Sequence, residues 1–141
     1  MKPEHKELLL QDLCARLQYK VKCQVYDIPT PYTLSGIIPS RVYQELYFEE
    51  MDYKECNGFV DIKYSKPYLF PLSSMTEEQK REYNRLKYDV PTYHYEYGDV
   101  VEEIELYESP KSFEYLIENH FDVYDLIPLG LANDATNKNI Y

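Results

Sequence analysis

Between residues 3 and 17, apolar side chains recur at spacings of three and four, which is the pattern of an amphipathic helix. We expect this helix to pack on a core through an apolar stripe that includes Leu13 and Cys14. Asp12 and Arg16 fall largely on the other side of the helix, where the pattern predicts contact with solvent.

Apolar and polar residues then alternate with a period of two, which predicts strands. Val21, Cys23 and Val25 are expected in a first strand. A second strand is expected at residues 32–38, where Gly36 indicates a bulge or a close approach of two backbones. The short loop between them favours an antiparallel hairpin.

Residues 41–55 are compatible with a helix or with a strand, and we favour the strand. The dipeptide Asn57–Gly58 follows, and both residues accept the positive φ angles of a type I′ turn. This turn predicts a hairpin to a strand at residues 59–64, which would be the last strand of an antiparallel meander.

The two prolines in residues 65–71 remove backbone donors, so this segment is predicted to be an ordered crossing outside any sheet. A helix is expected after it. Thr76 and Gln79 have the spacing of a capping box, in which each side chain binds the backbone amide of the other residue. Ser74 and Glu77 have the same spacing, so two starting positions remain open.

Tyr93, Tyr95 and Tyr97 stand at alternate positions, and this pattern predicts a strand with three phenols on one face. Residues 100–107 are compatible with a continuation of the same sheet and with a helix, so both alternatives remain open.

Ser109 followed by Pro110 is a helix start. One side of that helix is expected to carry Phe113, Leu116, Ile117 and His120. The apolar turn at residues 122–132 is expected to bury Leu126, Ile127 and Leu129, and residues 133–141 are interpreted as a mobile tail.

These elements predict an α+β fold in one domain, residues 1–132, since a chain of this length can bury one sufficient core. The expected order is an amino-terminal helix, an antiparallel β-meander, a capped central helix, a short tyrosine-rich strand region and a carboxy-terminal helix.

Charge is distributed unevenly along the chain, whose net charge is −10. Residues 1–88 carry 13 basic and 13 acidic residues, whereas residues 89–141 carry 2 basic and 12 acidic residues. Such a surface repels phosphate backbones and anionic membranes and attracts a basic partner, although it also serves solubility alone. We therefore expect a protein partner, with no direct binding of nucleic acid and no membrane association.

Sequence signatures of known chemistry are few. The glycines form no phosphate-binding loop, no serine lies in a nucleophile motif, and the three cysteines have no metal-binding spacing. Cys14 and Cys23 are interpreted as reduced core thiols. Glu118, His120 and Asp122 are the closest approach to a metal site, but His120 is interpreted as a helix-terminal histidine that interacts with the helix dipole. The sequence predicts no catalytic residue, cofactor or metal.

Three segments carry a family resemblance: LCARL at residues 13–17, KPYLFPLSSMTEEQK at residues 66–80 and NHFDVYDLIPLGLA at residues 119–132. They resemble a family of small uncharacterised proteins of Bacteroidota genomes, their phages and mobile elements. The resemblance implies a cytoplasmic setting in a bacterium or an infected cell, and it implies no activity, cofactor or catalytic residue.

The leading hypothesis is a non-enzymatic protein-interaction module. Its contact surface would be the acidic, tyrosine-rich third of a chain with seventeen tyrosines and no tryptophan, namely Tyr93, Tyr95, Tyr97, Glu102, Glu103, Glu105 and Tyr107. One alternative is a DNA mimic that inhibits a nucleic-acid-binding host protein. A second alternative is a small enzyme whose site assembles from residues distant in the sequence.

Overall fold

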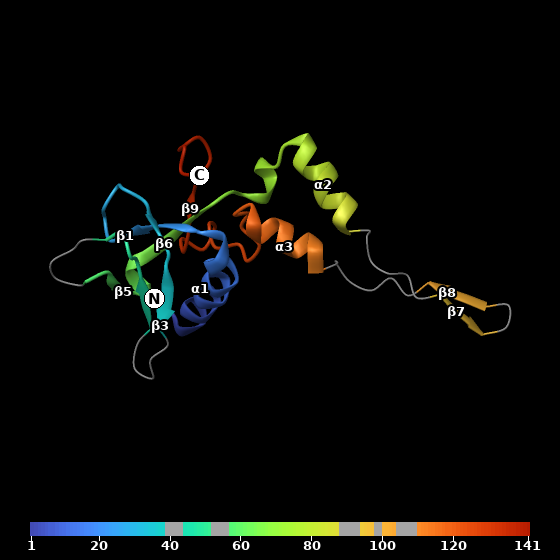
Figure 1. The fold of residues 1–141 in the computed structure, drawn as a ribbon, viewed down its shortest axis with the longest axis horizontal. Coiled ribbons are helices and arrows are strands. Elements are labelled where there is room, and N and C mark those ends of the chain that lie inside the picture. The colour runs from blue at the N-terminus through green and yellow to red at the C-terminus, as the bar shows by residue number, and fades with distance from the viewer. Residues whose placement is uncertain (39–43, 52–56, 88–93, 98–99, 104–109) are drawn as a thin grey trace. The chain divides into compact units, whose positions relative to one another are not determined.

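The protein has an α+β fold, seen here in a computed structural model that describes residues 1–38, 44–51, 57–87, 94–97, 100–103 and 110–141. The elements follow one another along the chain as drawn in Figure 1. Two compact units make up the chain: unit 1 contains residues 1–74 and 117–141, and unit 2 contains residues 75–116.

The first helix of unit 1, α1 (Pro3–Arg16), confirms the helix predicted for residues 3–17, but not the predicted division of its residues between a buried and an exposed face. Its proline stands at the start of the helix, where the missing N–H group costs no helical hydrogen bond. Leu9 and Leu13 are fully buried, but Cys14 is exposed, so its predicted place in the core was wrong.

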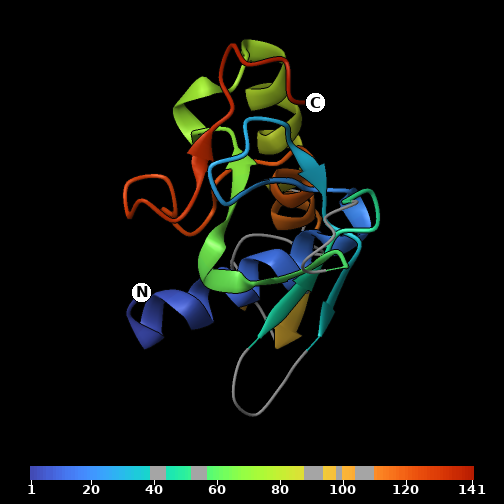
Figure 2. The same cartoon turned by 90° about the vertical axis from the view of Figure 1, so that its left-hand side faces the viewer.

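A four-stranded sheet has the strand order β2-β1-β6-β9. Its strands are β1 (Lys22–Val25), β2 (Tyr32–Thr33), β6 (Ser65–Leu69) and β9 (Asn133–Asp134). β1 pairs antiparallel with β2, which confirms the predicted first hairpin, and antiparallel with β6. β6 and β9 are parallel and lie side by side in Figure 2.

The segment predicted to cross outside the sheet is in fact the interior strand β6. Pro67 is tolerated in β6 because the pairing register of β6 with β1 requires no hydrogen bond from its backbone nitrogen to β1. Tyr26 N–H donates to Tyr64 O (2.8 Å), so every second residue from Tyr64 directs its backbone groups toward β1. Pro67 therefore faces the β9 side, where pairing begins only at Tyr68, and β6 loses no bond to β1.

A second sheet has three antiparallel strands in the order β3-β4-β5. These strands are β3 (Gly36–Ile38), β4 (Glu45–Tyr47) and β5 (Phe59–Asp61). The meander is confirmed, although residues 41–43 and 52–55 of the expected strand lie outside the described residues.

Two boundaries in this region differ from prediction. The expected strand at residues 32–38 is divided between the two sheets. Gly36 starts β3 and pairs with Tyr47, and a Cβ atom at Gly36 would lie at an ordinary contact distance of 3.6 Å from the Cβ atom of Tyr47. The expected strand at residues 59–64 ends at Asp61, whose carboxylate accepts from Lys63 N (3.1 Å) and caps a 3₁₀ turn at Ile62–Tyr64. This turn redirects the chain into β6.

Asn57 and Gly58 both have the predicted positive φ, at 51° and 88°. They do not form a two-residue hairpin turn, because Tyr47 pairs with Phe59 and the connection therefore runs over residues 48–58. Gly58 is required for space as well, since a Cβ there would lie 2.7 Å from Phe48 O.

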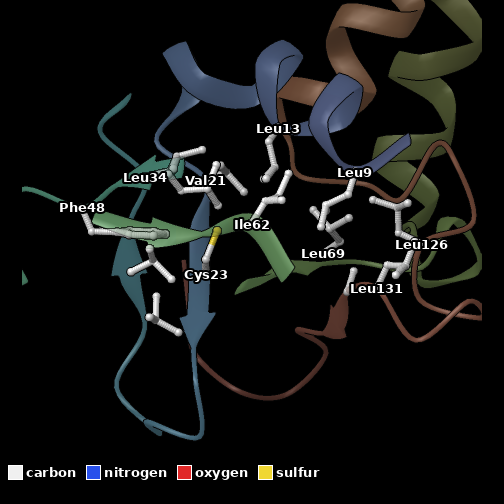
Figure 3. Packing of buried hydrophobic residues seen from close by; sticks show 14 of the residues in the cluster. Leu9, Leu13, Val21, Cys23, Leu34, Phe48, Ile62, Leu69, Leu126 and Leu131 are labelled. Atoms are coloured by element: carbon white, nitrogen blue, oxygen red, sulfur yellow. The ribbon is translucent and has the colours of Figure 1, made fainter. Parts of the chain in front are cut away.

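The core of unit 1 lies between α1 and the strands. Figure 3 shows Leu9 and Leu13 pointing from α1 toward Ile62 and Leu69, with Leu126 beside them. All five side chains are fully buried. Removing apolar surface from water is the main favourable term for such a core.

Unit 2 contains the second helix, α2 (Glu77–Lys87). The predicted Thr76–Gln79 capping box is present: Thr76 N donates to Gln79 Oε1 (2.9 Å) and Gln79 N donates to Thr76 Oγ1 (3.1 Å). The competing Ser74 hydroxyl instead donates to Pro71 O (2.6 Å). Thr76 is therefore the cap.

Unit 2 also contains a hairpin of β7 (His94–Tyr97) and β8 (Val100–Glu103), which pair antiparallel. The tyrosine-rich strand is thus confirmed for residues 94–97, and residues 100–103 belong to the same sheet.

The third helix, α3 (Pro110–Glu118), begins at the predicted proline, and Ser109 lies outside the described residues. Leu116 and Ile117 are buried, whereas Phe113 is 37 % exposed. His120 does not extend this helical face, because the helix has ended and its φ is +62°.

The apolar turn after α3 packs only in part as predicted. Leu126 is fully buried and Ile127 packs against the core, but Leu129 is 44 % exposed. Leu131 and Ala132 take the buried positions instead, and the amide groups of both donate to Leu126 O. Leu129 precedes Gly130, whose φ is +74°, at the exposed tip of the turn.

Residues 133–141 are attached to unit 1 and do not form the expected mobile tail. β9 pairs with β6, and Ala135 is buried and donates to Leu69 O (2.8 Å). The Asn133 amide also donates to Gln24 Oε1 of β1 (2.7 Å). A strand partner and these hydrogen bonds hold the segment on the sheet.

Candidate functional site

The acidic tyrosine hairpin, by which we mean residues 89–108, contains the predicted interaction residues. Four of them lie in the described strands: Tyr95 and Tyr97 in β7, and Glu102 and Glu103 in β8. The other three, Tyr93, Glu105 and Tyr107, lie outside the described residues.

The register of the hairpin brings the two chemical types together. Tyr95 pairs with Glu102, so one tyrosine position opposes a carboxylate position across the ladder, whereas Tyr97 pairs with Val100. Within the described residues, the β7–β8 sheet has two strands and no third. The outer edge of each strand is therefore not paired with another described strand.

The composition of this hairpin is extreme for its length. Residues 89–108 contain seven acidic residues, no lysine or arginine, and four tyrosines. Because like charges repel when neighbouring strands pair, such a hairpin gains from cations on its surface.

A second cluster of polar groups lies inside unit 1, where the sequence predicted solvent. Asp12 and Arg16 of α1 form an ion pair with Arg16 Nε 2.9 Å from Asp12 Oδ2, and both side chains are fully buried. Arg16 Nη2 also donates to the backbone oxygen of Phe121. The prediction that Asp12 and Arg16 are solvated was wrong, because the segment after α3 covers that side of α1.

Burial dominates the electrostatics of this ion pair. It raises the pKa of the Asp12 carboxyl above its ordinary value, although the Arg16 guanidinium opposes the shift. The atoms Asp12 Oδ1 and Arg16 Nη1 are buried and make no hydrogen bond within the described structure. Neither side chain has exposed surface, and the hydrogen bond from Arg16 fixes α1 to the backbone at Phe121.

His120 stands beside this pair and is 9 % exposed. Burial and the Arg16 charge lower the pKa of His120 to about 4, so its imidazole is neutral at neutral pH. His120 is helix-terminal, as predicted, because it follows the end of α3 and its backbone N–H donates to Ile117 O (3.1 Å), but its neutral ring brings no positive charge to the helix dipole. His120 is held in place by its backbone, since His120 O accepts from Phe70 N (2.8 Å).

The carboxylate of Asp122 accepts hydrogen bonds from the backbone of the following turn. Its Oδ1 accepts from Leu126 N and its Oδ2 from Ile127 N, both at 2.9 Å. Because α3 ends at Glu118, Glu118 and Asp122 do not share a helix face as the sequence suggested. Among the described residues, no group of three or more His, Cys, Asp or Glu side chains could hold a metal ion.

Cys23 lies in β1 and is fully buried, as predicted. Burial raises the pKa of its thiol to about 12, so this cysteine remains protonated and is not an activated nucleophile.

Sequence reasoning missed the buried pair because oppositely charged residues four apart are common on exposed helix faces. The signal that could have revealed it is position: Asp12 directly precedes the buried Leu13 on α1, and Arg16 follows Leu13 by about one helical turn.

No family model, curated protein or solved structure matches this chain. In the ranges that the structure describes, no helix combines the length and apolar character needed to cross a membrane.

Proposed function

We propose that this protein is a non-enzymatic interaction module that binds a basic protein partner through its acidic tyrosine hairpin. The observation that carries the proposal is the run of seven acidic residues without a lysine or arginine in residues 89–108. Opposite charge on the partner would mainly raise the rate of association and the specificity for basic partners. Its effect on the affinity would be smaller.

The hairpin offers a second means of recognition. A two-stranded sheet is marginally stable by itself in water, and its edges carry backbone donors and acceptors that a strand of another protein can pair with. Tyrosine contributes a large apolar area with a polar tip, which suits surfaces that bind proteins. Charge, tyrosine and strand edges that pair with no other described strand together favour a protein ligand.

The test compares two variants of the full chain in capture experiments from a Bacteroidota lysate. The hairpin variant replaces Glu102, Glu103, Glu105 and Glu108 by glutamine. The matched control removes the same number of carboxylates from exposed positions of unit 1, namely Glu4, Glu7, Glu49 and Glu50. The proposal predicts a basic partner that the wild type and the control retain at low salt and the hairpin variant loses.

High salt should release the same partner, since screening weakens exposed charge pairs. Equal capture by the hairpin variant and the control would contradict the proposal. Duplex DNA added as a competitor, with the polyanion heparin as its matched control, tests the DNA-mimic alternative, because displacement by DNA but not by heparin would indicate a partner that recognises DNA rather than negative charge alone.

A further inference from the structure

The hydroxyl group of Tyr141 lies between strands β1 and β6 of unit 1. Lys22 N donates to this oxygen at 2.9 Å, and the hydroxyl donates to Tyr68 O at 2.8 Å. A second acceptor, Lys22 O, is 3.5 Å away. One phenol thus receives one hydrogen bond and gives another, both with backbone groups of neighbouring strands.

The phenol occupies a place in the strand ladder. Hydrogen-bonded pairs recur every second residue in an antiparallel ladder, and the pair Tyr26–Tyr64 is bonded directly. The same register places Lys22 opposite Tyr68, but strand pairing ends at Cys23 and Pro67. The Tyr141 hydroxyl replaces the direct bond that would come next.

Aromatic side chains hold the Tyr141 ring in place. It stacks on His120 with ring centroids 3.8 Å apart and an interplanar angle of 11°, and Phe70 lies 6.0 Å away. The residue as a whole is 45 % exposed, yet burial of its hydroxyl raises the pKa of Tyr141 above its ordinary value. The phenol therefore keeps the proton that it donates to Tyr68 O.

The chain reaches this position through an exposed loop. Ala135 is buried, residues 136–139 are exposed, and Asn137 and Asn139 adopt positive φ angles of 61° and 50°. Tyr141 then returns to the sheet. Its contacts are thus separate from those of β9, so the ring can leave without unpairing that strand.

We propose that Lys22, Tyr68, Phe70 and His120 form a tyrosine-recognition site, which the chain's own Tyr141 fills and which a tyrosine side chain of another peptide can occupy in its place. The site matches a phenol in three respects: a flat ring to stack, one acceptor and one donor at its tip. Phenylalanine satisfies only the first respect, because it leaves both backbone groups unpaired.

The first test uses the full-length variant Tyr141→Gly, in which the site is open, and p-cresol as the probe, with toluene as the matched control. We expect saturable binding of p-cresol, seen as a rise in thermal stability and a shift of the Lys22 amide resonance. Toluene should bind at least about tenfold more weakly, since it cannot make the two hydrogen bonds. Wild-type protein should respond much more weakly than the variant, because its own Tyr141 competes with p-cresol for the site.

The peptide form of the ligand is tested with two pentapeptides on the same variant. One has the sequence of residues 137–141, and the other carries phenylalanine in the place of Tyr141. Preference for the tyrosine peptide supports the site. Equal binding of the two peptides, equal binding of p-cresol and toluene, or the same response from wild type would overturn it.

A further measurement does not depend on the folding of the glycine variant. In Tyr141→Phe the ring remains, but Lys22 N loses its acceptor. We expect hydrogen exchange of the Lys22 amide to become at least about tenfold faster than in the wild type. Unchanged exchange at Lys22 would show that the hydroxyl does not hold this position and would refute the site.

Discussion

Helices α1 and α2 each carry ion pairs between residues one turn apart, and the pairs differ in burial. In α1, Asp12 and Arg16 are both fully buried. In α2, Arg85 lies 2.7 Å from Glu82, and the two side chains are 64 % and 42 % exposed. Opposite charges at helical spacing are thus compatible with the most buried and with solvated parts of this protein.

The two helices are also stabilised differently at their ends and faces. α2 has a capping box and acidic residues in its first turn, and none of its residues is buried. For α1, no described side chain caps the helix, but Leu9 and Leu13 are in the core. The comparison teaches that α1 depends on tertiary burial, whereas α2 depends on bonds within its own sequence.

The sharpest test of this comparison breaks the buried pair. Asp12→Leu leaves the Arg16 guanidinium buried without its partner, so we expect a loss of about 3–5 kcal/mol in the free energy of unfolding. Urea denaturation at pH 7 measures this loss. The same experiment on Glu82→Leu should show no change that the fit can resolve, because that pair is exposed.

A double variant distinguishes the cost of an unpaired charge from the value of the pair. Asp12→Leu with Arg16→Met removes both charges, and we expect it to be more stable than Asp12→Leu alone. A double variant that is less stable than Asp12→Leu alone would contradict the explanation that the unpaired Arg16 charge causes the loss.

The next largest effect concerns pH and the histidine beside this pair. Because the pKa of His120 is about 4 in the folded protein and ordinarily 6.5, the unfolded state binds the proton first as pH falls. The contribution of His120 is complete above pH 6.5 and is lost progressively toward pH 4, to a total of about 3 kcal/mol. Urea denaturation over this pH range measures it.

His120→Asn is the matching variant, since asparagine accepts a positive φ. It should lose the part of the pH dependence that lies between pH 6.5 and 4. His5→Asn provides the histidine control and should keep the wild-type profile. If both variants follow that profile, His120 is not the titrating group.

The smallest resolvable effect concerns the cap of α2. Thr76→Ala removes one half of the capping box and should destabilise the start of the helix by about 1 kcal/mol. Hydrogen exchange of the first-turn amides should accelerate about fivefold, which is the same energy expressed as a rate. Ser73→Ala, at an exposed position, is the control. An equal acceleration of hydrogen exchange in this variant would show that loss of the cap is not the cause.

Local features were predictable from the sequence because neighbouring residues determine them. The capping box at Thr76, the period of α1 and the positive φ angles at Asn57–Gly58 follow from local sterics and hydrogen bonding. The inner strand β6 was not predictable from a segment with two prolines, since Pro67, the proline within β6, is acceptable only in the register that β1 and β9 impose. Burial of Asp12 and Arg16 likewise depends on a segment more than one hundred residues away.

The candidate sites likewise were predictable only where neighbouring residues define them. The composition of residues 89–108 identified the acidic tyrosine hairpin, and the structure added its register. The site around Tyr141 had no sequence signal, because its parts come from β1, β6, the turn after α3 and residues 133–141.

The place of Tyr141 in the ladder also has a consequence for the order of events during synthesis on the ribosome. Lys22 and Tyr141 are 119 positions apart, so strands β1 and β6 have both been translated well before the phenol that bridges their ends. Until then, Lys22 N and Tyr68 O can be satisfied only by water. A nascent chain therefore exposes this end of the sheet until Tyr141 has been translated and its hydroxyl reaches Lys22 and Tyr68.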